Sequence, residues 1–423
     1  RLGIPGIDFI TESKRFYPGI TEASHILGST NIDNQGISGI EKHMDDENVA
    51  LLQELGLARG NALAPVQLSV DMRVQHIMHE QLSDAMTRYQ AAAAAGVMMD
   101  VHTGEIIAMA SLPDFDPNQP ATALVKDTFN RITAGIFEPG STFKTVTIAG
   151  ALESGLVKIN DQFDARFGIR FGRFTIDDFH GKHRILSLPE VYKYSSNIGT
   201  IRIMQAMGKE AFRAFLSTLG FDQRVPFELP EMRLPVVPKE LSEVGAATAS
   251  FGHGLSVSPL HLVTAYSSFV NGGNYVPPTL YQRDIEEARQ HYRRVLKPET
   301  SDQIRYLMRL NALEGSGSQM NKAAQGYRVG GKTGTAEKVI DGRYSSSVVT
   351  NFFASAFPLD NPRYAMVIMV DEPKRENPQS GTTAGWNAGA VTGRIVQRIA
   401  PMLGIAPDFS EVTDLNLVPP ALR

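Results

Sequence analysis

Runs of strand-forming residues at two widely separated places constrain the fold of this chain more than any other feature. Two apolar runs at residues 96–101 and 105–110 flank His102-Thr-Gly104 and predict a β-hairpin. Three further strands are predicted near the C-terminus, at residues 328–340, 346–356 and 364–371. The two groups are separated by a mostly helical segment and flanked by a helix at each end. This order of elements suggests one antiparallel sheet built from both ends of the chain.

Helical patterns surround these strands. Residues 68–89 carry apolar residues at helical spacing, with Ser69 as a plausible N-cap, and residues 384–400 form a second helix-like stretch. The segment from about residue 114 to 322 reads as mostly helical and loop-rich. The expected fold class is therefore α+β, with an antiparallel sheet flanked by helices and a helical insertion between its two groups of strands.

The first 64 residues differ from the rest of the chain. They are mixed and glycine-rich, and pieces such as Gly36-Ile-Ser-Gly-Ile-Glu41 read as loop and strand without a strong period. This part has too few apolar runs for a core of its own. We therefore predict a small N-terminal domain over residues 1–64 and a large domain over residues 65–423.

The composition excludes several classes of function. The charge balance of 41 basic against 45 acidic residues gives a net charge of −4, which provides no basic field to hold nucleic acid. There is no cysteine, so thiol chemistry is excluded. The most apolar stretches are far shorter than the roughly 20 residues of a membrane-spanning helix. Since the chain starts at Arg1 without a signal-peptide pattern, we interpret its N-terminus as cut.

The first candidate for chemistry is Glu138-Pro-Gly-Ser-Thr-Phe-Lys144, which reads as a turn that opens into a helix. Positions i and i+3 share a helix face, so the Lys144 amine can reach the Ser141 hydroxyl. The helix N-terminus adds free backbone N–H groups where negative charge can develop. An isolated Ser-x-x-Lys is more often a helix cap beside a surface lysine. Ser141 is, however, the only serine here with a lysine three residues later.

A second candidate is Tyr194-Ser-Ser-Asn-Ile-Gly199, a short connector between two helix-like stretches that presents Ser195 and Asn197. A helix cap and turn is the simpler interpretation of this pattern alone. Ser29-Thr-Asn31 also matches Ser-x-Asn, but it lies upstream, in the predicted N-terminal domain.

The third candidate is Gly330-Gly-Lys-Thr-Gly-Thr335, within a predicted strand. Glycine weakens a strand interior, so the run indicates that a ligand or another backbone approaches closely. Residues 326–333 also match the phosphate-loop pattern G-x-x-x-x-G-K-[ST]. A phosphate loop follows a buried strand and opens a helix, whereas a strand follows here, so we favour a coincidence.

The three motifs in this order match the set Ser-x-x-Lys, Ser-x-Asn and Lys-Thr-Gly of the penicilloyl-serine transferases. Neighbouring phrases such as Phe137-Glu-Pro-Gly-Ser-Thr-Phe-Lys144 and Ser250-Phe-Gly-His-Gly-Leu255 resemble the class B penicillin-binding proteins. Ser-Ser-Asn resembles the septal, cell-division subgroup of Gram-negative bacteria. Phe16-Tyr-Pro18 and Gly28-Ser-Thr-Asn-Ile-Asp33 are similar to the pedestal domain of such proteins, so residues 1–64 correspond to a partial pedestal.

This resemblance implies a peptidoglycan D,D-transpeptidase that is acylated by β-lactams, with no metal or other cofactor. Ser141 would be the nucleophile, and Lys144, kept neutral by burial and by Lys332, would be its base. Ser195 would relay a proton, and Asn197 would position Lys144 and the substrate amide. The third motif, whose residues are Lys332, Thr333, Gly334 and Thr335, would bind the substrate: Lys332 and the hydroxyls of Thr333 and Thr335 would hold its terminal carboxylate. The backbone N–H groups of Ser141 and Thr335 would form the oxyanion hole.

The resemblance also implies a location and partners. The full-length protein would be a periplasmic enzyme anchored in the inner membrane, beside a membrane glycan polymerase and other division proteins. Its ligands would be peptidoglycan stem peptides and β-lactam antibiotics, with no nucleic acid.

Other functions share part of this pattern. A D,D-carboxypeptidase differs only in the acceptor, and a β-lactamase or β-lactam sensor shares the motif set, although no clear glutamate-containing loop is present to activate water. A metal enzyme could use Asp177, Asp178, His180 and His183, or His76 and His79. A catalytically inactive scaffold for division proteins is a further alternative.

One loop is expected to act near the site. Residues 375–385 join the last strand to the C-terminal helix and are rich in loop-forming residues. If the three C-proximal strands are neighbours, this loop lies where a lid over residues 332–335 would have to be, and we expect it to be mobile until a ligand orders it.

Overall fold

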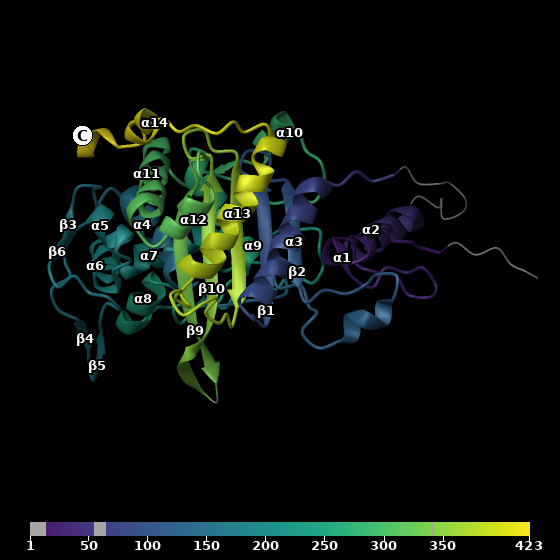
Figure 1. Cartoon of the computed structure of the whole chain (residues 1–423), viewed down its shortest axis with the longest axis horizontal. Coiled ribbons are helices and arrows are strands. Elements are labelled where there is room, and N and C mark those ends of the chain that lie inside the picture. The colour runs from purple at the N-terminus through teal and green to yellow at the C-terminus, as the bar shows by residue number, and fades with distance from the viewer. Residues whose placement is uncertain (1–13, 55–64, 341) are drawn as a thin grey trace, which may run out of the picture.

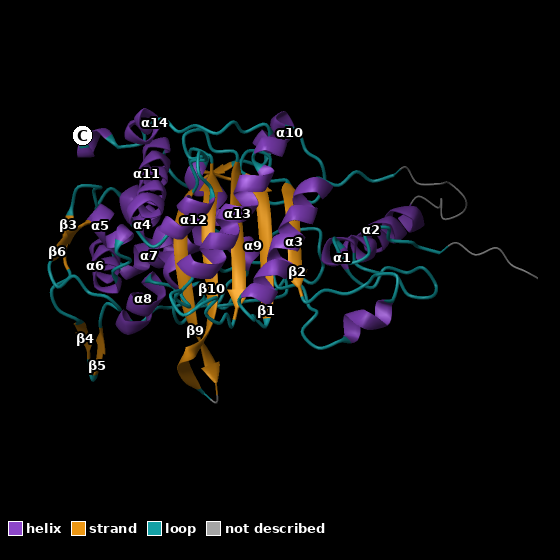
Figure 2. Ribbon diagram, in the orientation of Figure 1, coloured by secondary structure: helices purple, strands orange, loops and turns teal. Residues whose placement is uncertain are grey.

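The computed structural model describes residues 14–54, 65–340 and 342–423 (Figure 1). Its centre is a five-stranded antiparallel sheet with the strand order β2-β1-β11-β10-β9 (Figure 2). These strands are β1 (Ala93–Asp100), β2 (Ile106–Leu112), β9 (Gly330–Ile340), β10 (Arg343–Phe357) and β11 (Tyr364–Asp371). The predicted sheet from both chain ends is confirmed, since β1 pairs with β11. Asp341, in the predicted turn before β10, lies outside the described residues.

Both faces of this sheet are buried, and β11 shows how. Successive side chains of a strand point to opposite faces of the sheet. Every residue of β11 is buried, so both faces of this strand are covered. Val367 and Met369 belong to the core cluster on one face, and Met366 and Ile368 belong to the cluster on the other. The strand therefore reads as a continuous apolar run rather than as an alternating one.

Helices cover the two faces of the sheet. The helix α9 (Pro259–Val270) packs on one face, and α3 (Met72–Arg88) together with α13 (Ala390–Ile399) packs on the other.

The predicted N-cap of α3 is wrong: Asp71, not Ser69, accepts the hydrogen bond from the backbone N of Arg73. Ser69 instead donates to the carbonyl oxygen of Ile106, because its backbone lies beside the sheet.

The segment before α3 contains two helices that the sequence pattern did not predict, and the loop-and-strand interpretation of residues 36–41 holds only for residues 36–38, where Gly36 forms a β-bridge with Thr30. The structure has α1 (Ser24–Leu27) and α2 (Gly39–Glu54) there. Two i,i+4 pairs, Lys42–Asp46 and His43–Glu47, support α2. Ile26 and Ile40 join the main core cluster, so this segment packs on the body of the protein. Residues 1–13 and 55–64 of the predicted N-terminal domain lie outside the described residues, and its boundary stays a prediction.

The segment between β2 and β9 is mainly helical, as predicted. Its other helices are α4 (Phe143–Ser154), α5 (Leu188–Lys193), α6 (Asn197–Met207), α7 (Lys209–Thr218), α8 (Glu243–Ser250), α10 (Ile285–Gln290), α11 (Pro298–Glu314) and α12 (Ser318–Ala323). Three small two-stranded sheets, which the sequence pattern did not predict, pair β3 (Gln162–Asp164) with β6 (Ile185–Ser187), β4 (Ile169–Phe171) with β5 (Phe174–Ile176), and β7 (Asn274–Tyr275) with β8 (Arg293–Arg294). Of these three pairs, only β4 and β5 form a hairpin.

The C-terminal end is helical as expected. A π-helical turn (Gly385–Gly389) leads into α13, and α14 (Glu411–Asn416) follows. Among the residues that the structure describes, no helix has both the length and the apolar character needed to span a bilayer.

Arg309 of α11 ties the C-terminal tail to the start of β9. Its buried guanidinium donates to both carboxylate oxygens of Asp414, at 2.7 and 3.0 Å. It also donates to Asn321 Oδ1 at 2.8 Å and to the carbonyl oxygen of Val329 at 3.0 Å. One side chain thereby links α11, α12, α14 and the residue that precedes β9.

We expect Arg309→Ala to lower the free energy of unfolding by about 3 kcal/mol, because the partners of a buried charge lose their hydrogen bonds. Urea denaturation followed by circular dichroism measures the change. Arg289→Ala is the matched control, since Arg289 is exposed and its one ion pair among the described residues is with Glu286 of its own helix. Equal midpoints for the two variants would contradict this account of the tail.

Candidate active site

Ser141 lies in a short 3-10 turn, η2 (Gly140–Thr142), that leads directly into α4. Gly140 has φ 53°, and a Cβ there would lie 2.9 Å from the carbonyl oxygen of Thr335. Glycine therefore lets the turn approach β9 closely. Ser141 itself is partly exposed, whereas most of α4 is buried.

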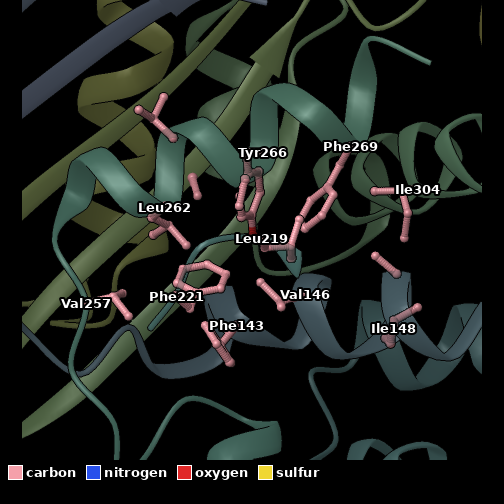
Figure 3. Packing of buried hydrophobic residues seen from close by; sticks show 14 of the residues in the cluster. Phe143, Val146, Ile148, Leu219, Phe221, Val257, Leu262, Tyr266, Phe269 and Ile304 are labelled. Carbon is pink, nitrogen blue, oxygen red and sulfur yellow. The ribbon is translucent and has the colours of Figure 1, made fainter. Parts of the chain in front are cut away.

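Two buried tyrosines hold the start of α4 in place through hydrogen bonds. Tyr266 donates to the carbonyl oxygen of Thr142 at 2.8 Å and bonds Thr145 Oγ1 at 2.7 Å, and Thr145 Oγ1 also bonds the Tyr192 hydroxyl at 2.9 Å. Figure 3 shows Phe143 and Val146 of α4 packed in the same apolar cluster as Tyr266. This packing sets the direction in which Ser141 and Lys144 leave the helix.

The second motif is the connector between α5 and α6, as predicted. The backbone of Ser195 has φ 55°, a left-handed conformation that residues other than glycine rarely adopt. Asp178 holds the next residues, since its carboxylate accepts hydrogen bonds from Ser196 Oγ at 2.7 Å and from the backbone N of Ile198 at 2.9 Å. The connector is therefore fixed at both its ends.

Two buried lysines converge on Ser195. Lys144 Nζ donates to Ser195 Oγ at 3.1 Å and to its carbonyl oxygen at 2.5 Å. Lys332 Nζ, which comes from β9, donates to the same Oγ at 2.9 Å. The structure thus joins residues of the three motifs around one hydroxyl group, although they lie almost 200 positions apart in the sequence.

The environment shifts the pKa of both lysines downward. Burial lowers the pKa of Lys144 well below its ordinary value, the charge of Lys332 lowers it further, and Asp178 acts in the opposite direction. Burial lowers the pKa of Lys332 to about 7. Because desolvation disfavours a charged amine, Lys144 is kept in the neutral form that accepts a proton.

The third motif lies on β9, the edge strand of the sheet. A Cβ on Gly334 would lie 2.4 Å from the carbonyl oxygen of Pro139, so the close backbone approach indicated by the glycines is present. Thr333 Oγ1 bonds Ser316 Oγ at 2.6 Å, and Thr335 is partly exposed beside the Ser141 turn. The close contact between the turn and β9 thereby places Ser141 and Thr335 on neighbouring segments.

Asn197 lies at the start of α6, in the connector, but its Nδ2 donates to the carbonyl oxygen of Asp177 at 3.3 Å. Among the described residues it makes no hydrogen bond to Lys144, whose partner is Ser195. The expected role of Asn197 in positioning Lys144 stays a prediction.

Several residues that support the site were not predicted from the sequence to do so. Asp178 braces the connector, and Asn311 donates to the carbonyl oxygen of Gly331 at 2.8 Å. Glu138, three residues before Ser141, accepts from the Gly254 N–H and the Tyr344 hydroxyl, both at 2.9 Å, and contacts His253 Nδ1 at 3.0 Å. Their only sequence signal is that Glu138 and His253 lie inside the phrases that carry the family resemblance.

The other candidate patterns form no site of their own in the described residues. Asp178 serves the connector, His76 Nδ1 faces Glu22 and His79 Nε2 faces Asp114. No group of three or more potential metal ligands gathers in the part of the chain that the structure describes. The phosphate-loop pattern runs into strand β9 rather than into a helix. Ser29-Thr-Asn31 follows α1, outside the groove.

The loop over residues 375–385 lies where it was expected. The backbone N of Ala384 donates to Thr335 Oγ1 at 3.3 Å, and Asn351 Nδ2 donates to the carbonyl oxygen of Thr382 at 2.7 Å. The end of this loop therefore borders the third motif. Its ordering by a ligand stays a prediction.

Comparison with known proteins agrees with this geometry. Residues 94–397 match the model of the penicillin binding protein transpeptidase domain. The chain is 37% identical to the probable peptidoglycan D,D-transpeptidase FtsI of Caulobacter vibrioides, over 98% of this chain and 70% of that protein. It is 30% identical to the peptidoglycan D,D-transpeptidase FtsI of Escherichia coli K12, over 98% of this chain and 72% of that protein.

Solved structures show the same relationship. Penicillin binding protein 3 from Mycobacterium tuberculosis, complexed with aztreonam, superposes with a TM-score of 0.80 at 26% identity, covering 93% of this chain and 91% of that one. The transpeptidase domain of Burkholderia pseudomallei penicillin-binding protein 3 gives a TM-score of 0.72 at 28% identity, covering 83% of this chain and all of that one. The chain therefore belongs to the penicillin-binding transpeptidases of the FtsI and penicillin-binding protein 3 type.

Proposed function

We propose that this chain cross-links peptidoglycan stem peptides through an acyl-enzyme on Ser141. The convergence of Lys144 and Lys332 on Ser195 Oγ, next to the Ser141 turn, carries this proposal. This cluster supplies a neutral amine on Lys144, a cation on Lys332 and a relay hydroxyl on Ser195. Relatives named D,D-transpeptidase support the reaction type.

In the acylation step, Ser141 Oγ attacks the carbonyl carbon of the penultimate D-alanine of a stem peptide, and its proton passes to the neutral amine of Lys144. The bond to the terminal D-alanine then breaks. Ser195, which bonds both lysines, relays a proton to the departing amine. The products of this step are free D-alanine and an ester on Ser141.

Charge on the substrate is held from the β9 side of the groove. The backbone N–H groups of Ser141 and Thr335 would face the developing oxyanion. The hydroxyls of Thr333 and Thr335, with the ammonium group of Lys332, would hold the terminal carboxylate. A β-lactam carries a similar carboxylate and carbonyl, so it would enter the same site.

In the second step the amine of a neighbouring stem attacks the ester, and Ser141 recovers its proton. Asn197, at the exposed side of the connector, would contact the substrate amide. Transfer to water instead would give a D,D-carboxypeptidase, which the same groups could support. The relatives named transpeptidase favour the amine as acceptor.

The same resemblance supports a location for the reaction. We place this chain in the periplasm, as part of a protein anchored in the inner membrane that acts at the division septum. A membrane glycan polymerase and division proteins would be its partners there. Residues 1–64 would be the partial pedestal that connects the enzyme to them.

Intact-mass spectrometry after incubation with benzylpenicillin tests the assignment of Ser141. We expect one covalent equivalent on the native chain and none on Ser141→Ala, since Ser141 is the only serine with a lysine three residues later in the sequence. Ser154→Ala, at the other end of α4, is the control and should be acylated like the native chain. An adduct that persists in Ser141→Ala would refute the assignment.

The second prediction concerns the base. Lys144→Arg should slow acylation as much as Lys144→Ala, by about a thousandfold, because a guanidinium stays protonated and accepts no proton. Stopped-flow acylation with a chromogenic cephalosporin measures the rates. Lys322→Arg, an exposed lysine on α12, should acylate at the native rate. Rapid acylation of Lys144→Arg would show that Lys144 contributes only charge.

The third prediction is a pH profile. Lys332 must be charged to hold a carboxylate, and its pKa lies near 7, so the acylation rate constant should fall as pH rises above about 7. Lys144 must be neutral, so the rate should also fall at low pH, once Lys144 becomes protonated. In Lys332→Arg, where the charge persists, the alkaline fall should vanish. A native rate that keeps rising through pH 9 would contradict this division of roles.

A further inference from the structure

The segment between α4 and α5 exposes aromatic rings to solvent. Phe167, Phe174 and Phe179 are 76%, 59% and 82% exposed. Figure 1 shows β4 and β5 projecting from the end of the molecule opposite to α1 and α2. Exposed rings that gather in one segment indicate an interaction site, since soluble proteins rarely expose large apolar groups together.

The hairpin of β4 and β5 holds these rings in a defined arrangement. Ile169 pairs with Ile176 on the face that packs against the core, and Phe171 pairs with Phe174 at the tip. A Cβ on Gly168 would lie 2.8 Å from Thr175 Cγ2, so the residue after Phe167 lies directly beside β5. Phe167 therefore directly precedes the base of the hairpin, and Phe174 lies at its tip.

Arginines accompany these rings. The guanidinium carbon of Arg173 lies 5.3 Å from the ring centroid of Phe174, and that of Arg166 lies 6.0 Å from Phe167. Arg166 pairs with Asp164, but within the described residues Arg170 and Arg173 have no carboxylate in ion-pair range. We call residues 166–176, which contain three arginines and no acidic residue, the Arg-Phe hairpin. Asp164 precedes the hairpin and Asp177 follows it, so the cations that it offers to a ligand are Arg170 and Arg173.

The Arg-Phe hairpin is joined directly to the active-site connector. The residues that follow β5 are Asp177 and Asp178, which accept hydrogen bonds from Asn197 and from Ser196. Further cations lie along this route: Lys182 Nζ is 4.8 Å from the ring centroid of Tyr194, the residue that precedes Ser195. The hairpin thus joins the connector through Asp177 and Asp178, and a cation and an aromatic ring, Lys182 and Tyr194, lie at the connector.

We propose that the Arg-Phe hairpin binds the glycan strand of peptidoglycan close to the stem peptide that enters the active site. The apolar faces of sugar rings can stack on the exposed phenylalanines. The guanidinium groups of Arg170 and Arg173, which no carboxylate of the described residues pairs, fit the carboxylates of neighbouring stem peptides, although Arg170 Nε also donates to the carbonyl oxygen of Gly172. This inference rests on the proposed function, because it names how that function's polymeric substrate is held outside the groove.

A membrane is the other surface that basic and aromatic side chains can bind. Position decides between them. The hairpin is tied to the connector that carries Ser195, and it lies at the far end of the molecule from the N-terminal segment that resembles a pedestal (Figure 1). A contact here therefore serves the substrate of the groove.

Co-sedimentation with purified Gram-negative peptidoglycan sacculi tests the proposal. The protein is first acylated with benzylpenicillin, which blocks the groove. The double variant Phe174→Ala/Arg173→Ala should bind sacculi about tenfold more weakly than the native chain, since it loses one ring and one charge. Phe174→Tyr, which keeps a ring, should bind like the native chain.

The matched control is Phe409→Ala/Arg289→Ala, which removes one exposed phenylalanine and one exposed arginine elsewhere. It should bind sacculi normally. Both double variants should be acylated at the native rate, which shows that they fold and that the groove is intact. A charge reversal, Arg170→Glu/Arg173→Glu, gives a second variant that leaves the apolar face of the hairpin untouched.

Equal sacculus binding by the native chain and both hairpin variants would overturn the proposal. So would a loss of binding confined to vesicles of phosphatidylglycerol and phosphatidylethanolamine, because the hairpin would then bind lipid. Failure of the proposed function is a separate result: benzylpenicillin would not label Ser141. In that case the hairpin proposal is still tested, because sacculus binding by the unlabelled native chain can be compared with binding by the hairpin variants.

Discussion

Two lysine side chains buried against one serine hydroxyl are the arrangement on which the rest of this structure depends. Each ammonium group would be costly to bury, so the pKa of both lysines is lowered, and Lys332 adds to the shift of Lys144. The arrangement requires α4, the connector and β9 to meet within hydrogen-bond distance of Ser195. The buried tyrosines behind α4 and the carboxylate of Asp178 hold that meeting point in place.

Close backbone contact is the second requirement. The Ser141 turn touches β9 only because Gly140 and Gly334 have no side chain to separate them. This contact leaves Ser141 and Thr335 partly exposed along one groove while the lysines stay buried. A nucleophile open to a polymer and a base shielded from water are thereby combined in the same site. The position of β9 at the sheet edge leaves one side of that strand open to a ligand.

The sheet explains why such distant segments cooperate. The strand β11 lies between β1 and β10, so the two ends of the chain are bound together at the centre of the fold. The long insertion between β2 and β9 then supplies the connector and, on its outer side, the Arg-Phe hairpin. Ser141, Lys144, Ser195 and the hairpin that we infer to hold the polymer thus come from one insertion, whereas Lys332 and Thr335 come from strand β9 of the sheet itself.

The sequence by itself determined the five strands of the central sheet, the helices over residues 68–89 and 384–400 and the three motifs, because periodicity, turn residues and i,i+3 spacing are local properties. It misplaced the cap of α3 and missed α2, whose helix is supported by pairing and by packing on the body rather than by a strong apolar period. Only the tertiary structure decided that Ser195 lies between Lys144 and Lys332, and that the Asn197 amide faces Asp177 instead of a lysine. It also revealed Asp178, Glu138 and Asn311 as supports of the site. Contacts between residues so far apart in the chain are fixed by how the elements pack, and no local pattern records that packing.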